Sequence, residues 1–198
     1  SIKIENLAEE LVAIEKDQKS AGILLLGTNL TPEQINLVAS IQENLVVLDT
    51  CFETLDVNFV VMNNILGAYH AGKYLLGLGH KKIGYVESNS RMYNFDMRKK
   101  GFLQALSEKE VTIEDKHYFS LSPTVITYQD NFKESILACM NNLPTALFCE
   151  ADYMAISVIK TLNELGIRVP HDISVIGFDN INESQVVTPE LTTIHVKK

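Results

Sequence analysis

The sequence predicts an α/β protein in which parallel strands alternate with helices. Short apolar runs, such as residues 22–26, 146–149 and 173–178, are typical of strands, and the composition of 173–178 is that of a strand buried on both faces. We expect residues 22–26 to be buried as well. Segments with helical periodicity, about 10 to 15 residues long, separate such runs. Regular alternation of the two indicates βαβ units, and therefore parallel sheets flanked by helices.

The elements follow one another along the whole chain of 198 residues. The predicted strands are residues 22–26, 45–49, 59–62, 83–86, 118–121, 146–149 and 173–178. The predicted helices are residues 5–16, a helix that starts at 31–34, and residues 65–78, 96–108, 128–140 and 152–165.

Particular residues mark the ends of several helices. Thr31, Pro32 and Gln34 form the pattern of a capping box with proline in the first turn. Gly79 and Gly166 follow predicted helices, and glycine closes a helix well because it adopts the left-handed conformation. These signals fix helix boundaries that periodicity alone leaves open.

Composition excludes several classes of protein. The net charge of −8 argues against DNA binding by this chain itself, because such domains carry a basic face. No apolar run approaches the roughly 20 residues of a membrane span, so we expect no membrane partner. The three widely spaced cysteines fit reduced thiols in a cytoplasm, and neither they nor the histidines have metal-ligand spacing. We therefore expect a cytoplasmic protein with no metal and no cofactor.

Asp179 is the first candidate for a binding role. It follows the apolar run 173–178, and ligands of open α/β sheets bind outside the carboxyl ends of the strands. Asn180 adjoins it, and a long polar loop follows. Asp49 also follows a strand, but there we favour a turn residue that bonds its own backbone.

Arg98 is the second candidate. It lies near the start of a predicted helix, where a cation opposes the helix dipole, and Lys99 and Lys100 add to the effect. Either Asp96 or an oxygen of a ligand must compensate. A guanidinium binds a carboxylate, phosphate or vicinal diol through two parallel bonds. The sequence leaves open whether Arg98 is a surface residue paired with Asp96 or a ligand contact.

Other polar positions have simpler interpretations. Asp152 stands where a strand turns into a helix and reads as an N-cap that still faces a ligand edge. Gly77 and Gly79 end a helix rather than begin one, so they are not a dinucleotide fingerprint. His80 reads as a structural hydrogen-bonding residue. No catalytic constellation is recognisable, so we expect no enzyme.

Five segments in order resemble the effector-binding domain of the LacI/GalR family of bacterial transcriptional repressors. They are LLGLGHKKIG at 75–84, RKKGF at 98–102, PTALFCEADYMA at 144–155, GIRVPHDISVIGFD at 166–179 and PELTT at 189–193. The resemblance extends from about residue 4 to the C-terminus.

The resemblance implies a two-lobed fold like that of the periplasmic binding proteins. It implies an N-terminal subdomain at 1–82, a C-terminal subdomain at 83–180 and a crossover at 181–198. The family's opening strand, first helix and next strand would precede Ser1, so we expect the first lobe to be incomplete. The family's last strand and helix would follow His195 in the same way.

The resemblance also implies how such a domain works. A small effector, usually a sugar or a purine, binds between the lobes, and a separate N-terminal helix-turn-helix domain binds the operator as a homodimer. Arg98 and Asp179 match family effector contacts, Asn94 lies in a loop that often adds one, and Asp152 matches a near-standard aspartate. Asn63–Asn64 stand where the family often has Asp-Asn. The amides and carboxylates favour a neutral sugar here.

Two alternatives remain. A transport-type sugar-binding protein shares the cleft but needs a secretion signal, and the pairing of GHKKI with RxxGF favours the repressor. An enzyme of the doubly wound class would have to hide its chemistry in unremarkable positions.

Overall fold

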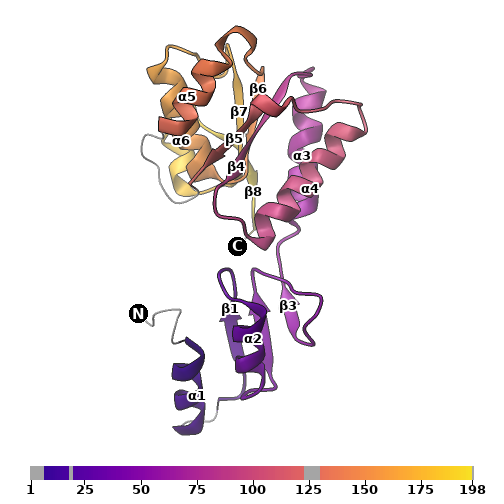
Figure 1. Ribbon diagram of the computed structural model, residues 1–198, viewed down its shortest axis with the longest axis vertical. Coiled ribbons are helices and arrows are strands. Elements are labelled where there is room, and N and C mark those ends of the chain that lie inside the picture. The colour runs from indigo at the N-terminus through magenta and orange to yellow at the C-terminus, as the bar shows by residue number, and fades with distance from the viewer. Residues whose placement is uncertain (1–6, 18–19, 123–129, 198) are drawn as a thin grey trace. The chain divides into compact units, whose positions relative to one another are not determined.

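The computed structural model describes residues 7–17, 20–122 and 130–197. The chain forms two compact units (Figure 1), one of Ser1–Met62 with Met92–Asn94 and the other of Asn63–Arg91 with Phe95–Lys198. The three-part division into 1–82, 83–180 and 181–198 stays a prediction.

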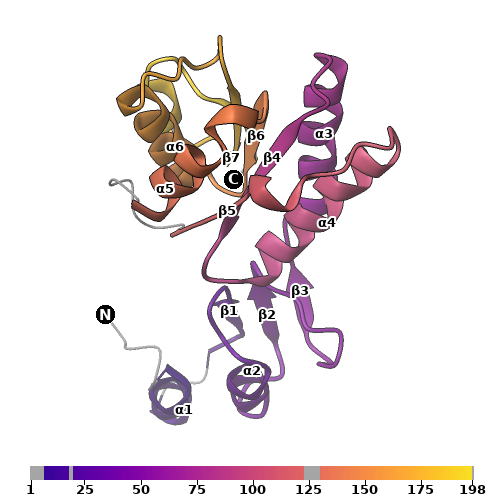
Figure 2. The same cartoon turned by 45° about the horizontal axis from the view of Figure 1, so that its top comes forward.

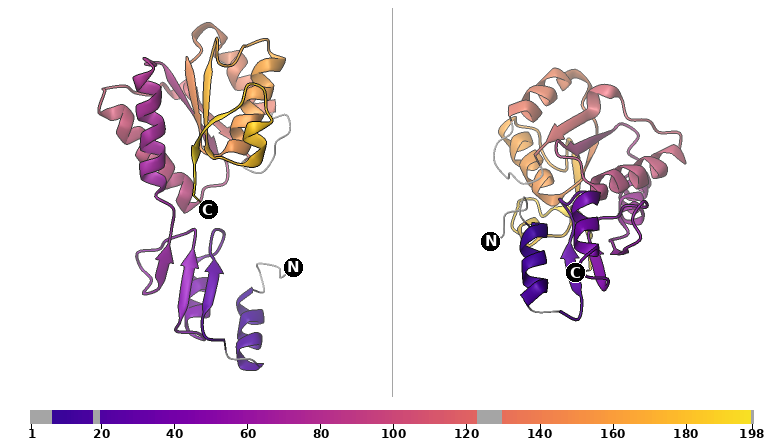
Figure 3. Two further views of the ribbon diagram at one scale, coloured as in Figure 1. Left: turned by 180° about the vertical axis from the view of Figure 1, so that it is seen from behind. Right: turned by 60° about the horizontal axis from the view of Figure 1, so that its bottom comes forward.

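The first unit is a small parallel sheet with two helices. Its strands lie side by side in the order β1-β2-β3 (Figure 3). Apolar side chains of α2 pack with those of β1 and β2, and Leu11 of α1 joins this cluster. The elements are α1 (Leu7–Asp17), β1 (Ile23–Leu26), α2 (Pro32–Ala39), β2 (Leu45–Leu48) and β3 (Asn58–Val60).

The prediction that residues 22–26 form a buried strand is wrong, because only one face of the strand is buried. Leu25 is buried, but Leu24 and Leu26 are 75% and 67% exposed. Successive side chains of a strand point to opposite faces, and the helices of this unit pack against the face that carries Leu25. An apolar run therefore does not by itself distinguish a doubly covered strand from a singly covered one.

The capping box at the start of α2 is confirmed. The Thr31 hydroxyl accepts a bond from the Gln34 backbone N–H at 3.3 Å, and the Gln34 side chain accepts one from the Thr31 N–H at 2.9 Å. These two bonds satisfy N–H groups that the first turn of a helix otherwise leaves unpaired.

The second unit is a five-stranded parallel sheet in the order β5-β4-β6-β7-β8. Helices α3 and α4 cover one face and α5 and α6 the other (Figures 1 and 2). Its helices are α3 (Asn64–Gly77), α4 (Tyr93–Ser107), α5 (Asp130–Ala138) and α6 (Asp152–Glu164). Its strands are β4 (Ile83–Ser88), β5 (Tyr118–Leu121), β6 (Ala146–Cys149), β7 (Ser174–Asp179) and β8 (Thr192–His195).

The sequence predicts most of this unit. The predicted strands at 118–121 and 146–149 match β5 and β6, and Gly79 and Gly166 have the expected positive φ angles of 89° and 74°. Strand β8 lies in the segment predicted as a crossover and was not expected. The predicted helix 128–140 is α5, and its residues 128 and 129 lie outside the described residues.

The packing of the core of the second unit positions the sheet edge that carries the candidate site. Tyr85 of β4, Phe102 of α4 and Phe148 of β6 are fully buried, and the rings of Phe102 and Phe148 stack 4.4 Å apart. Since β4, β6 and β7 are adjacent and parallel, their carboxyl ends meet at one edge. Glu150 and Asp179 lie at this edge.

Candidate functional site

Arg98 and Asp179 meet at the carboxyl edge of the five-stranded sheet. Nη2 of Arg98 donates to Oδ1 of Asp179 at 3.0 Å, and Nη1 lies 3.5 Å from Oδ2. The arginine side chain is 4% exposed and the aspartate side chain 23%. The pair thus presents a partly accessible carboxylate whose position a buried cation fixes.

Arg98 is held on its other sides as well. Its Nε donates to Oδ1 of Asn64 at 2.9 Å, and Nη1 donates to the backbone carbonyl of Glu150 at 2.5 Å. Its guanidinium carbon lies 3.8 Å from the centre of the Phe178 ring. The interpretation of Arg98 as a surface partner of Asp96 is therefore wrong, because Asp96 pairs with Arg91 instead.

The backbone at Asp179 is unusual. Asp179 and Asn180 have φ angles of 117° and 54°, in a region that non-glycine residues seldom adopt. The Asn180 N–H donates to the Thr193 hydroxyl at 3.3 Å, and its side-chain nitrogen lies 2.8 Å from Nδ1 of His195. Strand β8 therefore supports the turn that carries Asp179. Such outliers cluster at ligand sites.

The interpretation of Asp152 as an N-cap is wrong. Ala151 is the N-cap of α6 and makes no side-chain cap bond. The Asp152 carboxylate is instead fully buried and accepts bonds from the Thr193 hydroxyl at 2.6 Å and the Ile181 N–H at 3.0 Å. Burial raises the pKa of Asp152, and these two bonds oppose that rise. Asp152 thus connects the chain just after Asp179 to strand β8.

Gly177 makes room for that carboxylate. A Cβ atom at this position would lie 2.2 Å from Oδ1 of Asp152. The glycine two residues before Asp179 is therefore a steric requirement of the same arrangement.

Asn94 belongs to the first unit by its contacts. Its side-chain nitrogen donates to Oδ1 of Asp49 at 2.8 Å and to the Asp49 backbone carbonyl at 3.2 Å. The Thr28 hydroxyl donates to the other oxygen of Asp49 at 2.8 Å. Our interpretation of Asp49 as a residue that bonds its own backbone is therefore wrong, although its φ of 68° does place it in a turn.

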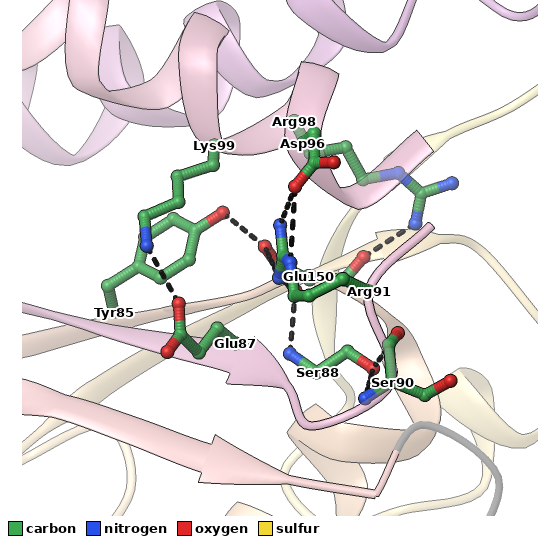
Figure 4. Close-up of polar contacts among 9 residues, drawn as sticks. All are labelled: Tyr85, Glu87, Ser88, Ser90, Arg91, Asp96, Arg98, Lys99 and Glu150. Carbon is green, nitrogen blue, oxygen red and sulfur yellow. Dashed lines mark hydrogen bonds and ion pairs between the residues drawn. The ribbon is translucent and has the colours of Figure 1, made fainter. Parts of the chain in front are cut away.

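The sequence analysis missed Glu150. Its side chain is completely buried and accepts bonds from the Tyr85 hydroxyl, the Ser88 N–H and Nη1 of Arg91, all at 2.7 to 2.9 Å (Figure 4). Burial raises the pKa of Glu150, and the bonds from Ser88, Tyr85 and Arg91 oppose that rise. Only its place directly after a buried strand, the same criterion that selected Asp179, signals it in the sequence.

Other features of the described residues lie away from this edge. His80 is a structural residue as predicted, because its Nδ1 lies 2.9 Å from the Thr145 hydroxyl. A surface cavity of about 480 Å³ is lined by Lys73, Lys109 and neighbours, and it shares no lining residue with the Arg98–Asp179 pair. No helix within 7–17, 20–122 or 130–197 has the length and apolarity that a bilayer crossing requires.

Comparison with known proteins connects this geometry to a family. The family of the periplasmic binding protein-like domain matches residues 73–198. The HTH-type transcriptional repressor PurR of Mannheimia succiniciproducens is 35% identical over 205 residues, covering 99% of this chain and 57% of that protein. PurR of Pasteurella multocida is 34% identical over 203 residues, with the same coverage of both chains. The chain thus spans somewhat more than half the length of these relatives.

A solved structure has the same fold. A regulatory protein of the LacI family from Chloroflexus aggregans superposes with a TM-score of 0.84 at 20% identity, covering 97% of this chain and 69% of that one. The two-lobed periplasmic-binding-protein-like fold class expected from the sequence is confirmed. The relatives are transcriptional repressors and not enzymes, as the sequence analysis expected.

Proposed function

Because the chain belongs to the effector-binding domains of LacI-family transcriptional regulators, we propose that it senses a small molecule at the Arg98–Asp179 edge of its five-stranded sheet. The single observation that carries this proposal is the 3.0 Å pair itself, in which a buried arginine holds a partly exposed carboxylate at the carboxyl ends of the strands. Asp179 is the group that meets the ligand, and Arg98 orients it.

A neutral polar effector suits this edge. Three carboxylates, those of Asp96, Glu150 and Asp179, pair with the two guanidinium groups of Arg91 and Arg98, and the Asp152 carboxylate lies close enough to repel that of Asp179. Ionised carboxylates only accept hydrogen bonds, so Asp179 selects donors such as sugar hydroxyls or the N–H groups of a purine. We favour a neutral sugar, in which a vicinal diol would donate to Asp179. Each bond to the charged group contributes about 1.5–3 kcal/mol.

Asn94 and Asp152 have different places in this proposal. Asn94 stays a predicted effector contact: it is a buried residue of the first turn of α4 rather than of a loop, and its side chain donates to Asp49. Asp152 acts through Thr193 and Ile181 and keeps the Asp179 turn in place.

The regulatory role follows from the relatives. In the full-length protein, a separate helix-turn-helix domain would bind operator DNA as a homodimer in the cytoplasm, as the relatives' names as HTH-type repressors suggest. Effector binding would change operator affinity by its differential affinity for two conformations of the domain, typically about 1–3 kcal/mol.

A thermal-shift screen of neutral sugars and purine bases on the intact chain tests the proposal. A hit should raise the melting temperature of the wild type with concentration but leave that of Asp179→Ala unchanged. Equal shifts in wild type and variant would place the ligand elsewhere and remove the assignment.

A further inference from the structure

We propose that Glu150 determines specificity at this edge: it neutralises Arg91 and so keeps the site closed to anionic ligands. The inference rests on the proposed function, because it concerns which chemical class of effector the same edge admits. Glu150 touches no ligand in this account. It is a positioning residue that acts through Arg91.

Both carboxylate oxygens of Glu150 are hydrogen-bonded to neighbouring residues. Its carboxylate oxygens lie 2.8 and 2.9 Å from Nη1 of Arg91, and they also accept bonds from the Tyr85 hydroxyl and the Ser88 N–H (Figure 4). Burial raises the pKa of Glu150, and these donors oppose that rise because they stabilise the ionised form. Glu150 is fully buried, so its ion pair with Arg91 is shielded from solvent on that side.

Arg91 is the reachable member of the pair. Its side chain is 35% exposed, whereas that of Glu150 is 0% exposed. On its other edge, Nε and Nη2 donate to Oδ1 of Asp96 at 3.1 and 2.7 Å. All three nitrogens of the guanidinium therefore already donate to protein carboxylates, and the group of three residues carries one net negative charge.

Arg91 also lies next to the proposed effector site. Glu150 connects the two arginines. Its carboxylate binds the Arg91 side chain, and its backbone carbonyl accepts a bond from Arg98 at 2.5 Å. The Phe95 ring lies near both guanidinium groups, 6.0 Å from that of Arg91 and 5.6 Å from that of Arg98. A ligand at Asp179 therefore approaches a surface on which the exposed guanidinium group of Arg91 is already neutralised.

The physical consequence is discrimination by charge. An unneutralised arginine at a partly exposed position binds phosphate or carboxylate through two parallel bonds. Here an anion would have to displace Glu150 or Asp96 and would meet their repulsion. A repulsive element of this kind lowers the affinity for anions and leaves the affinity for neutral ligands unchanged.

Inorganic phosphate is the probe, titrated by calorimetry into the intact chain at constant ionic strength. The variants are Glu150→Gln, Asp96→Asn, Arg91→Ala and the double variant Glu150→Gln/Arg91→Ala. Glu150→Gln keeps the shape of the side chain and its acceptor oxygen but removes the charge. We expect it to bind phosphate at least about 10-fold more tightly than the wild type, and the double variant to lose this gain.

Asp96→Asn is the second test, because the Asp96 side chain is 56% exposed and its replacement spares the core. It should also gain phosphate affinity, by a smaller factor, and its gain should likewise require Arg91. The proposal is overturned if the wild type binds phosphate as tightly as both charge-removing variants, or if the gain survives Arg91→Ala.

The outcomes separate this inference from the proposed function. Loss of effector binding in Asp179→Ala without a phosphate gain in Glu150→Gln or Asp96→Asn would leave the effector site standing and refute the role of Glu150. If those variants gain affinity for phosphate but no effector is found whose binding depends on Asp179, the role of Glu150 would stand and the effector site would be refuted.

Discussion

Nη2 of Arg98 and Oδ1 of Asp179 lie 3.0 Å apart, although 81 residues separate the two in the chain. The arginine comes from α4 and the aspartate from the end of β7. Only the packing of α4 on the sheet brings the two together. The arrangement is asymmetric, since the guanidinium is buried by Asn64, Phe178 and the Glu150 carbonyl while the carboxylate keeps an open side.

This asymmetry predicts unequal effects on stability. Arg98→Ala should lower the free energy of unfolding by about 3 kcal/mol or more, because it removes a donor from Asn64 and from the Glu150 carbonyl and breaks the buried pair with Asp179. Asp179→Asn should cost less, because that side chain is partly solvated and the amide still accepts a bond. Urea denaturation measures both, with exposed Lys100→Ala on the same helix as the control. Equal losses in the two variants would contradict the asymmetry.

Burial of Glu150 predicts a pH dependence of stability. Burial raises the pKa of Glu150 above its ordinary value of 4.5, and the bonds from Ser88, Tyr85 and Arg91 oppose that rise. The folded state therefore holds the proton more tightly than the unfolded state, so this group stabilises the fold most below about pH 4.5 and loses that contribution as the pH rises through its folded pKa. The other titratable groups around Glu150 are the same in the wild type and in a Glu150→Gln variant. They are Glu87, Asp96, Lys99, Cys149 and Asp152.

The measurement is the difference in unfolding free energy between wild type and Glu150→Gln as a function of pH. The difference should fall from pH 4 toward neutrality, because glutamine does not titrate. A difference that grows with pH would mean that the pairing with Arg91 outweighs burial in the folded state.

Gly101 in the RKKGF segment allows α4 to contact α3. A Cβ atom at this position would lie 2.0 Å from the backbone carbonyl oxygen of Ile65, which cannot move without disturbing the start of α3. Gly101→Ala should therefore destabilise the fold by several kcal/mol and shift Arg98 on the same helix. Gly77→Ala is the matched control, because nothing lies within 4 Å of its Cβ position. It should stabilise the fold by up to about 1 kcal/mol, since alanine favours helix.

The bond between Asp152 and the Thr193 hydroxyl predicts energetic coupling across the Asp179 turn. Asp152→Asn and Thr193→Val should each cost about 1–3 kcal/mol, and the double variant should cost clearly less than the two together. Urea unfolding of the four proteins completes the cycle. Additive losses would show that the two residues act independently and that Asp152 does not hold the turn through Thr193.

The sequence predicts the elements of this fold well because the signals are local. Apolar runs mark β5 and β6 to the residue, and Thr31 begins α2 and Gly166 closes α6 for reasons contained in a few neighbouring residues. The exposed face of β1 was not predictable in this way, because the burial of Leu24 depends on what packs over the sheet rather than on the strand's own residues.

The candidate site was predictable only in part. Arg98 and Asp179 were identified one at a time, from a cation in the wrong place on a helix and a carboxylate at the end of a strand. Their mutual pairing replaces the Asp96 partner that proximity in sequence suggested. Glu150 and Asp152 resemble any turn residue in the sequence, and their roles come from partners 29 to 65 residues away.

The most direct test of the proposed site is calorimetric titration of the screened effector into wild type, Asp179→Asn, Arg98→Lys and the control Gly77→Ala. Replacing the acceptor carboxylate or the arginine that orients it should weaken binding at least about 10-fold, because each removes a bond to a charged group. Gly77→Ala should bind as the wild type does. Unchanged affinity in both Asp179→Asn and Arg98→Lys would contradict the assignment of the effector site to this pair.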